Sequence, residues 1–216
     1  MTKPTIKPHS VILFQGDSIT DVGRSRSAIG ANSPDGMGFG YPSLAAEELL
    51  AKFPDYFLQC YNRGISGDRI RDMSHRWERD SLRLVPDLIS ILIGVNDTWN
   101  HLFMGLGSDP EDFKKVYHQL LTNTRLSLPE TMLVLCEPFI LLTGEVTEEW
   151  SIDISQRQAA VQDLAREFDA LFVPFQTALD EESGHVSAHK LLEDGVHPTE
   201  IGHRLLADCW VKTVLG

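Results

Sequence analysis

Short apolar runs alternate with longer amphipathic runs about five times along this chain of 216 residues. Apolar segments with almost no polar interruption are typical of strands that are buried on both faces of a parallel sheet. Such runs predict five strands, at residues 11–14, 56–61, 88–93, 132–136 and 171–173. Gly16, Gly94, Pro138 and Pro174 close four of them, because glycine and proline favour turns.

The amphipathic runs predict helices between the strands. We expect helices over residues 41–53, 69–84, 154–168 and from about 199, and a further one that begins at Asp109-Pro110 with a capping residue and a proline in its first turn. Strictly alternating strands and helices indicate an α/β fold, here a three-layer α/β/α sandwich around a five-stranded parallel sheet of the flavodoxin-like kind. The length fits one ordinary domain over residues 1–216.

Charge and composition exclude several classes of function. Asp and Glu number 31 against 19 Lys and Arg, which gives a formal net charge of −12. An acidic surface repels phosphate backbones and anionic lipids, so we expect neither a nucleic-acid partner nor a membrane partner. The chain shows neither a signal peptide nor a membrane span, and we expect a cytoplasmic protein. Cys60, Cys136 and Cys209 lie in apolar runs and are predicted to be buried free thiols.

A serine follows the first predicted strand across one glycine, in Phe14-Gln-Gly-Asp-Ser18. Open α/β sheets bind ligands at the carboxyl ends of their strands, so Ser18 is a candidate nucleophile at the mouth of the sheet. A helix-capping or turn serine is the alternative. The pentapeptide G-x-S-x-G of the α/β-hydrolases does not occur in this sequence.

Asp194 and His197 stand three residues apart, just before the last predicted helix. A short loop with this spacing can hold a carboxylate against one imidazole nitrogen and leave the other nitrogen free as a general base. The alternative is an aspartate that caps the loop beside a histidine without a catalytic role.

Gly67 and Asn96 follow the second and third predicted strands. A glycine exposes its backbone N–H at close range, and an asparagine amide can point at a developing oxyanion. Each of the two is also an ordinary turn residue. Taken together, a nucleophile, two oxyanion donors, a base and its orienting acid are predicted to converge on one edge of the sheet.

The chain resembles the SGNH hydrolases, also called the GDSL esterase/lipase family. The four family blocks occur in order, as Gly16-Asp-Ser-Ile-Thr20, Ile65-Ser-Gly-Asp68, Gly94-Val-Asn-Asp97 and Asp194-Gly-Val-His-Pro198. Within that family the sequence is most similar to bacterial carbohydrate acetylesterases that act on acetylated xylan. This narrower similarity rests on four segments, Gly16-Asp-Ser-Ile-Thr-Asp-Val-Gly-Arg24, Asn62-Arg-Gly-Ile-Ser-Gly67, Arg76-Trp77-Glu78 and Ile93-Gly-Val-Asn-Asp-Thr-Trp99.

The resemblance implies a serine esterase with a Ser18–His197–Asp194 triad and an acyl-enzyme intermediate. Its oxyanion hole would consist of the backbone N–H of Ser18, the N–H of Gly67 and the side chain of Asn96. No cofactor or metal is implied, and the expected partner is a small ester, namely an O-acetylated sugar or xylo-oligosaccharide, with a homo-oligomer expected by analogy. Lysophospholipase, thioesterase and arylesterase activities are rivals within the same chemistry.

A flavodoxin-like binding module, in which the glycine-rich loop at residues 23–40 would hold a phosphate, is the alternative from another class. That loop contains neither a Walker motif nor G-x-G-x-x-G before a helix. For an esterase we expect the same loop to lie over the site, and its polar residues to favour acetyl over long acyl esters. Asp17 and Trp99 are candidate substrate-binding residues. For Trp99 the reason is that an aromatic ring can stack on a sugar.

Several other residues are expected to be structural. His185 and His189 have the spacing of a zinc helix but lack the glutamate of H-E-x-x-H. Trp77 is expected in the core, and His203 on a helix surface. A solvated helix face is expected for Arg69, Arg71, Arg76 and Arg79.

Overall fold

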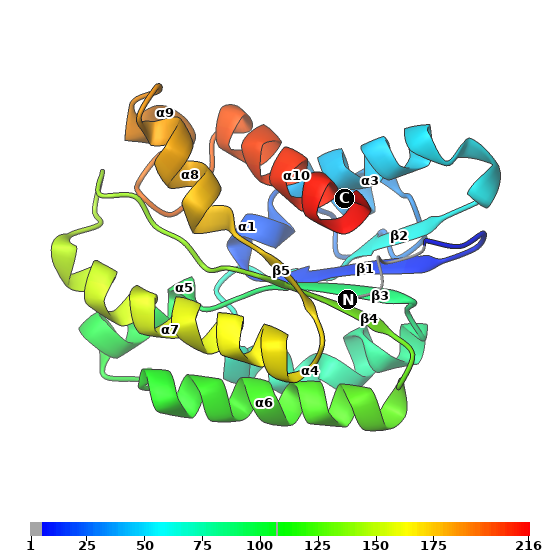
Figure 1. Cartoon of the computed structure of the whole chain (residues 1–216), viewed down its shortest axis with the longest axis horizontal. Coiled ribbons are helices and arrows are strands. Elements are labelled where there is room, and N and C mark those ends of the chain that lie inside the picture. Colours follow the sequence, from blue (N-terminus) through cyan, green and yellow to red (C-terminus); the bar gives the residue numbers. More distant parts are fainter. Residues whose placement is uncertain (1–5, 107) are drawn as a thin grey trace.

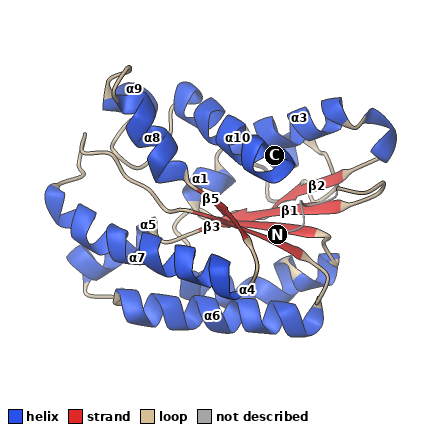
Figure 2. Ribbon diagram, in the orientation of Figure 1, coloured by secondary structure: helices blue, strands red, loops and turns tan. Residues whose placement is uncertain are grey.

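The computed structural model describes residues 6–106 and 108–216, and it shows a five-stranded parallel sheet between two layers of helices (Figure 1; Figure 2). The strands are β1 (Val11–Gly16), β2 (Gln59–Asn62), β3 (Leu88–Leu92), β4 (Met132–Cys136) and β5 (Leu171–Val173). They lie in the order β2-β1-β3-β4-β5. This is the flavodoxin-like order, so the predicted three-layer α/β/α sandwich is confirmed.

Helices cover both faces of the sheet (Figure 1). One layer consists of α3 (Tyr41–Lys52), α8 (Phe175–Ser183) and α10 (Glu200–Leu215), and the other of α4 (Ile70–Asp80), α6 (Pro110–Ser127) and α7 (Glu148–Glu167). The chain passes from β1 to the first layer and from β3 to the second. A crevice therefore opens at the carboxyl ends of these two neighbouring strands, where open α/β sheets bind ligands.

Short helical segments connect the main elements. They are α1 (Ser18–Asp21), α2 (Pro34–Met37), α5 (Val95–Trp99) and α9 (Ala188–Leu191), 3₁₀ turns at Pro54–Tyr56 and Leu82–Leu84, and a π-helical segment at Asn100–Met104. Two of these, α1 and α5, directly follow the strands that flank the crevice.

The strand register brings the carboxyl ends of the strands to one edge. Gly16 pairs with Leu92, Leu92 with Cys136, and Cys136 with Val173. The loops that leave these strands therefore begin side by side, although they are far apart in the sequence.

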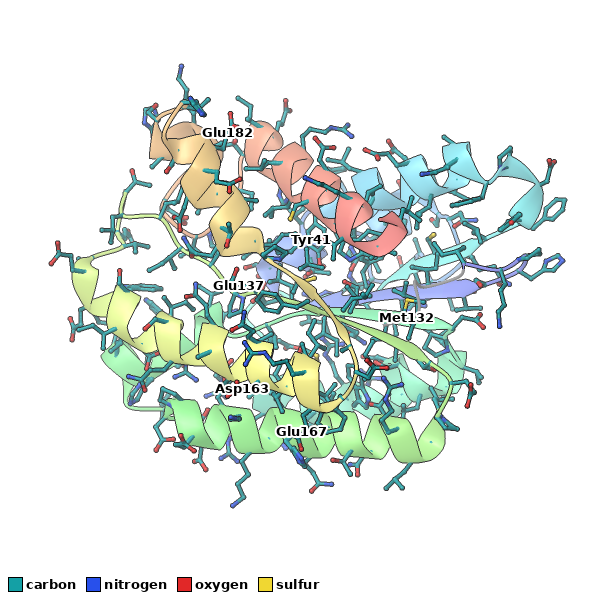
Figure 3. The ribbon with its side chains drawn as sticks, in the orientation of Figure 1. Tyr41, Met132, Glu137, Asp163, Glu167 and Glu182 are labelled. Carbon is teal, nitrogen blue, oxygen red and sulfur yellow. The ribbon has the colours of Figure 1, made fainter. Side chains whose placement is uncertain are left out.

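Each helical layer buries a tryptophan against the sheet. Trp210 of α10 is fully buried and its Nε1 donates a hydrogen bond to Ser90 Oγ at 2.9 Å. The ring of Tyr41 is also fully buried, between this layer and the sheet (Figure 3). On the opposite face, Trp77 Nε1 donates to Thr124 Oγ1 at 2.9 Å, which confirms the expected core position of Trp77.

Most predicted elements are present, with some displaced boundaries. The α6 helix begins as predicted, because Asp109 Oδ1 accepts the N–H of Asp112 at 2.8 Å and Pro110 occupies the first turn. The α7 helix begins at Glu148, six residues before the predicted start, and α4 ends at Asp80 before a 3₁₀ turn. The second strand begins only at Gln59, because Phe57 adopts a left-handed conformation with φ of 51°.

Two residues expected on the surface are buried. His203 is 6 % exposed, and its Nδ1 accepts the backbone N–H of Tyr41 at 3.2 Å across the α3–α10 contact. Arg76 is 8 % exposed, whereas Arg71 and Arg79 on the same helix are exposed as predicted. Both errors have the same cause, because helical periodicity does not reveal a polar side chain whose partner comes from a distant segment.

The three cysteines are free thiols, with Cys60 and Cys136 buried and Cys209 partly so. No helix within residues 6–106 and 108–216 has the length and apolar character needed to cross a bilayer.

Candidate active site

Ser18 is the first residue of α1, immediately beyond β1. The Asp17 carboxylate Oδ1 accepts the N–H of Ile19 at 3.0 Å and so caps this short helix. Gly16 is required before it, since a Cβ at this position would collide with Thr20 Oγ1 and the Leu92 carbonyl oxygen. The strand can therefore turn sharply and present Ser18 at the edge of the sheet.

The side chains of Ser18, His197 and Asp194 form a hydrogen-bonded relay. Ser18 Oγ lies 2.9 Å from His197 Nε2, and His197 Nδ1 lies 2.7 Å from Asp194 Oδ2. With Nδ1 carrying the proton that Asp194 accepts, Nε2 is unprotonated and accepts the Ser18 hydroxyl proton. A nucleophile next to a base, and a base oriented by an acid, is the geometry of a catalytic triad.

The loop that carries Asp194 and His197 is fixed by local contacts. Asp194 Oδ1 accepts the backbone N–H groups of Val196 and His197 at 2.9 and 2.8 Å. Burial alone would raise the pKa of Asp194, but the backbone N–H and ring of His197, together with the Val196 N–H, hold it below its ordinary value. The carboxylate therefore stays ionised and holds the imidazole in one tautomer.

Two glycines let the neighbouring connection between β4 and α7 pack against this loop. Gly144 and Gly195 have φ of 60° and 94°, and a Cβ at Gly195 would collide with the carbonyl oxygens of Thr143 and Leu141. Leu141 N–H donates to the Gly195 carbonyl at 2.9 Å. The carbonyl of Asp194 accepts the N–H of Glu145 at 3.2 Å. The triad loop thus rests on the chain between β4 and α7.

Gly67 and Asn96 come from the loops after β2 and β3. Gly67 is exposed and has φ of 87°, and a Cβ there would meet no atom within 4 Å. Within the described residues the N–H of Gly67 has no protein acceptor. Asn96, in α5, donates Nδ2–H to the Asp68 carbonyl at 3.1 Å and lines the same cavity as His197. Ser18 begins a helix, which leaves its N–H without an intrahelical partner. These three groups can serve as donors to an oxyanion.

Comparison with known proteins decides the family. The model of the GDSL-like lipase/acylhydrolase family matches residues 14–205. The chain belongs to this family. It is therefore a carboxylic ester hydrolase, and the binding-module hypothesis is dropped.

Relatives of this acylhydrolase include enzymes and solved structures. It is 32 % identical over 205 residues to an acetylxylan esterase from Geobacillus stearothermophilus, covering 94 % of this chain and 93 % of the relative. A GDSL-like lipase structure from Parabacteroides merdae superposes with a TM-score of 0.95 at 39 % identity, covering 98 % of both chains. The acetylxylan esterase Axe2 from G. stearothermophilus superposes with a TM-score of 0.87 at 30 % identity, covering 97 % of this chain and 96 % of Axe2. Two further structures of Axe2 are described as catalytic mutants, one with serine and one with histidine replaced by alanine.

A cavity of about 260 Å³ opens beside the relay of this acylhydrolase. Its walls are formed by Val95, Asn96, Trp99, Glu145, Val146, Trp150, Asp194, Val196 and His197. Trp99 is 42 % exposed and forms part of the cavity wall. Sequence reasoning missed Glu145, Val146 and Trp150, because the predicted helix began at residue 154 and left them outside any motif.

The side chains that line this cavity come from outside the glycine-rich loop at residues 23–40, whereas Phe39 of that loop lines a second groove together with Pro198. Asn32 of the same loop binds the edge strand β2, with Nδ2 donating to the Leu58 carbonyl at 2.7 Å and Oδ1 accepting the Cys60 N–H at 2.8 Å. A strand edge left open pairs readily with other chains, and this loop covers it.

Asp17 also has a different place from the expected one. Its side chain is 1 % exposed and caps α1, so it contacts the turn beneath Ser18 rather than a substrate. Burial raises its pKa to about 7, although the Ile19 N–H and the charge of His197 lower it. Asp97 behaves alike, because burial raises its pKa to about 7 while its Oδ2 accepts the Ile70 N–H at 3.1 Å.

Within residues 6–106 and 108–216, no group of three or more His, Cys, Asp and Glu side chains is placed to hold a metal ion.

Proposed function

We propose that this acylhydrolase removes acetyl groups from sugars through a Ser18–His197–Asp194 triad. The observation that carries the proposal is the relay from Ser18 Oγ to His197 Nε2 at 2.9 Å and from His197 Nδ1 to Asp194 Oδ2 at 2.7 Å. The serine and histidine replacements in Axe2, which are described as catalytic mutants, support the same assignment.

The reaction proceeds in two steps. Ser18 Oγ attacks the ester carbonyl carbon while His197 Nε2 takes the hydroxyl proton, and the oxyanion receives hydrogen bonds from the N–H groups of Ser18 and Gly67 and from Asn96 Nδ2. The C–O bond to the alcohol then breaks, and His197 returns the proton to the departing oxygen. In the second step His197 takes a proton from water, whose oxygen attacks the acyl carbon. The bond to Ser18 Oγ then breaks, His197 returns the proton to Oγ, and the acid is released. Asp194 stabilises the imidazolium in both steps.

The size and lining of the cavity support a small substrate group. About 260 Å³ is below the common range for drug-sized ligands, and the walls combine aromatic rings with Glu145 and Asn96. Hydroxyl-rich substrates need such polar partners, whereas a fatty chain needs a continuous apolar groove. The named activity of the Geobacillus relative, an acetylxylan esterase, points to acetylated xylo-oligosaccharides as the class to test first.

The test is a series of nitrophenyl esters from acetate to decanoate, followed by acetate release from acetylated xylo-oligosaccharides, with Ser18→Ala as the inactive control. We expect kcat/KM to fall with acyl length. A higher kcat/KM on octanoate than on acetate would refute the acetyl preference and leave the triad untouched.

A Trp99 variant tests whether the enzyme binds the sugar part of the substrate. Trp99→Ala should weaken kcat/KM on acetylated xylo-oligosaccharide about 10-fold and leave nitrophenyl acetate nearly unchanged, because an aromatic contact contributes roughly 1 kcal/mol or more. Equal losses on both substrates would show that Trp99 supports the site rather than the sugar.

A long-acyl esterase is the second candidate, favoured by an apolar groove on the other side of the triad loop. This groove has a volume of about 750 Å³ and is lined in part by Val22, Phe39, Leu44, Pro198 and Ile201. Phe39 and Ile201 are 74 % and 52 % exposed. The name of the Parabacteroides relative, a GDSL-like lipase, agrees with this alternative. Phe39→Ala discriminates between the two, because only a long-acyl enzyme should lose activity on octanoate through it.

A further inference from the structure

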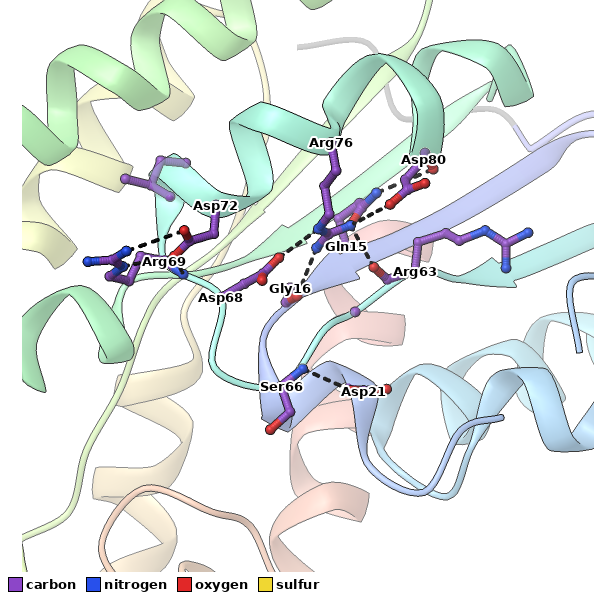
Figure 4. A network of polar contacts seen from close by, with 12 residues as sticks. Gln15, Gly16, Asp21, Arg63, Ser66, Asp68, Arg69, Asp72, Arg76 and Asp80 are labelled. Atoms are coloured by element: carbon purple, nitrogen blue, oxygen red, sulfur yellow. Dashed lines mark hydrogen bonds and ion pairs between the residues drawn. The ribbon is translucent and has the colours of Figure 1, made fainter. Parts of the chain in front are cut away.

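The Arg76 guanidinium is buried beneath the catalytic edge and connects two of its loops (Figure 4). Its Nη1 donates to Gln15 Oε1 at 2.8 Å, and its Nη2 lies 3.4 Å from the Gly16 carbonyl, at the end of the strand that leads to Ser18. The same Nη1 donates to the Arg63 carbonyl at 2.9 Å in the loop after β2. One side chain therefore ties the nucleophile strand to the loop that carries Gly67.

The strongest of these contacts is the ion pair with Asp68. Arg76 Nε lies 2.6 Å from Asp68 Oδ2, and the two side chains are 8 % and 12 % exposed. A charge pair shielded from water in this way is screened little by salt and holds a defined geometry. Asp80 adds a weaker contact to Arg76 Nη1 at 3.4 Å.

Asp68 in turn contacts both of the oxyanion donors outside the nucleophile turn. It follows Gly67 directly in the chain, and its carbonyl oxygen accepts Asn96 Nδ2–H at 3.1 Å. Ser66, on the other side of Gly67, donates its N–H to Asp21 Oδ2 at 2.8 Å. Gly67 thus lies between two anchored residues, and within the described residues its own N–H has no protein acceptor.

We propose that Arg76, through Asp68, is a positioning residue that sets Gly67 and Asn96 at the distance from Ser18 at which they stabilise the oxyanion. This inference rests on the roles of Ser18, Gly67 and Asn96 proposed above. Oxyanion donors act where the negative charge develops, so a shift of the loop by a fraction of an ångström reduces kcat more than it alters substrate binding. Arg76 touches neither substrate nor reacting atoms and acts only through the loop.

The predicted signature is a loss in kcat without a matching change in KM. Asp68→Asn keeps the size of the side chain and an acceptor for Arg76 but removes the charge. We expect Asp68→Asn and Arg76→Gln to lower kcat on nitrophenyl acetate by about 10- to 100-fold, with KM changed less than about threefold. Arg76→Lys, which keeps the charge but not the forked geometry, should recover part of the loss.

Arg71→Gln is the matched control. Arg71 lies on the same helix, α4, and pairs with Asp112 on the outer surface at 3.2 Å, with its side chain 50 % exposed. This variant should keep wild-type kcat and KM. Melting temperatures of all variants separate positioning from loss of fold, and Asp68→Asn carries the test if Arg76→Gln does not fold.

A double-mutant cycle measures whether Asp68 acts through the oxyanion donor Asn96. In an Asn96→Ala background one of the two donors that Asp68 positions is gone, so the effect of Asp68→Asn on kcat should shrink, to about threefold. Folded Arg76→Gln and Asp68→Asn enzymes with kcat within twofold of wild type, or fully additive effects in the cycle, would overturn the proposal. If Ser18→Ala remained active, the proposed function itself would fail, which is a different outcome and is measured separately.

Discussion

The two halves of the catalytic edge are held in opposite ways. On the nucleophile side, Asp17, Arg76 and Asp68 are nearly buried, and the hydrogen bonds of Arg76 join segments that are far apart in the chain. On the acid–base side, the His197 and Asp194 side chains are 49 % and 45 % exposed, and Asp194 accepts its hydrogen bonds from residues two and three positions along the chain, Val196 and His197.

This difference has a physical consequence for substitutions. A local, exposed loop can lose a side chain with little effect on the packing of the sheet. A buried charged network cannot, since removing one partner leaves the other desolvated and unpaired. We therefore expect variants on the acid–base side to affect turnover far more than stability, and variants on the nucleophile side to affect turnover and stability together.

The largest effect should come from the residues at the junction of the two halves. Ser18→Ala and His197→Ala should each reduce kcat by roughly 10³-fold or more while melting stays close to wild type. Steady-state kinetics on nitrophenyl acetate, with circular dichroism for the fold, measure both. A folded variant that keeps more than about a tenth of the wild-type rate would show that its residue is not the nucleophile or the base.

Asn96→Ala should have the next largest effect, about 10²-fold in kcat with little change in KM, because one oxyanion donor is typically worth that much in the transition state. The same kinetics measure it, with Asn100→Ala, one turn along the chain, as the matched control. An effect confined to KM would reassign Asn96 to substrate binding.

The pH dependence of turnover should show one limb, with about a tenfold fall per pH unit on its acid side. A histidine acts as base only when neutral, and imidazole groups titrate near pH 6.5. Asp194 adds no second limb there, because its pKa lies below its ordinary value. Profiles of kcat/KM on a neutral ester measure this limb. If chemistry limits the rate and the rate does not change between about pH 5 and 9, the base is not a histidine.

The smallest expected effect is a change in the free energy of unfolding with pH, and its sign differs between the two halves. Burial raises the pKa of Asp17 from 3.8 to about 7, so its stabilising contribution is complete below pH 3.8 and is lost as pH rises to 7. Asp17→Asn should therefore match wild type near pH 4 and exceed its free energy of unfolding by about 1 kcal/mol or more at pH 8.

Asp194→Asn is the matched comparison. Because the folded pKa of Asp194 lies below 3.8, its contribution is present above that pH and lost below it, and this variant should be the less stable one at pH 8. Urea unfolding at both pH values measures the two variants, and equal signs would refute the contrast between the halves.

The same contrast explains what could be predicted from the sequence. The five strands follow from apolar runs, and the Asp194–His197 loop from residues three apart, because both signals are local in the chain. Sequence patterns placed Arg76 and His203 on the surface, because their partners Asp68 and Tyr41 come from other segments of the chain. They missed Trp150, because the cavity that it lines is formed by several segments. Helical periodicity places a residue on a face of its own helix but does not identify what packs against that face.

The loop at residues 23–40 shows what its position in the chain does not reveal. It begins directly after the first strand, but the open edge of β2 has backbone groups that need partners, and Asn32 supplies them. These partners belong to a distant strand, so the sequence pattern of the loop does not identify them.

Covalent labelling tests the central claim most directly. The wild-type enzyme, mixed with a fluorophosphonate and digested, should carry one label per chain on the peptide that contains Ser18, as read by mass spectrometry. Ser18→Ala should stay unlabelled, and His197→Ala should label far more slowly, because the hydroxyl has lost its base. Labelling of Ser18→Ala at the wild-type rate, or a label on any other residue of the wild-type enzyme, would contradict the account.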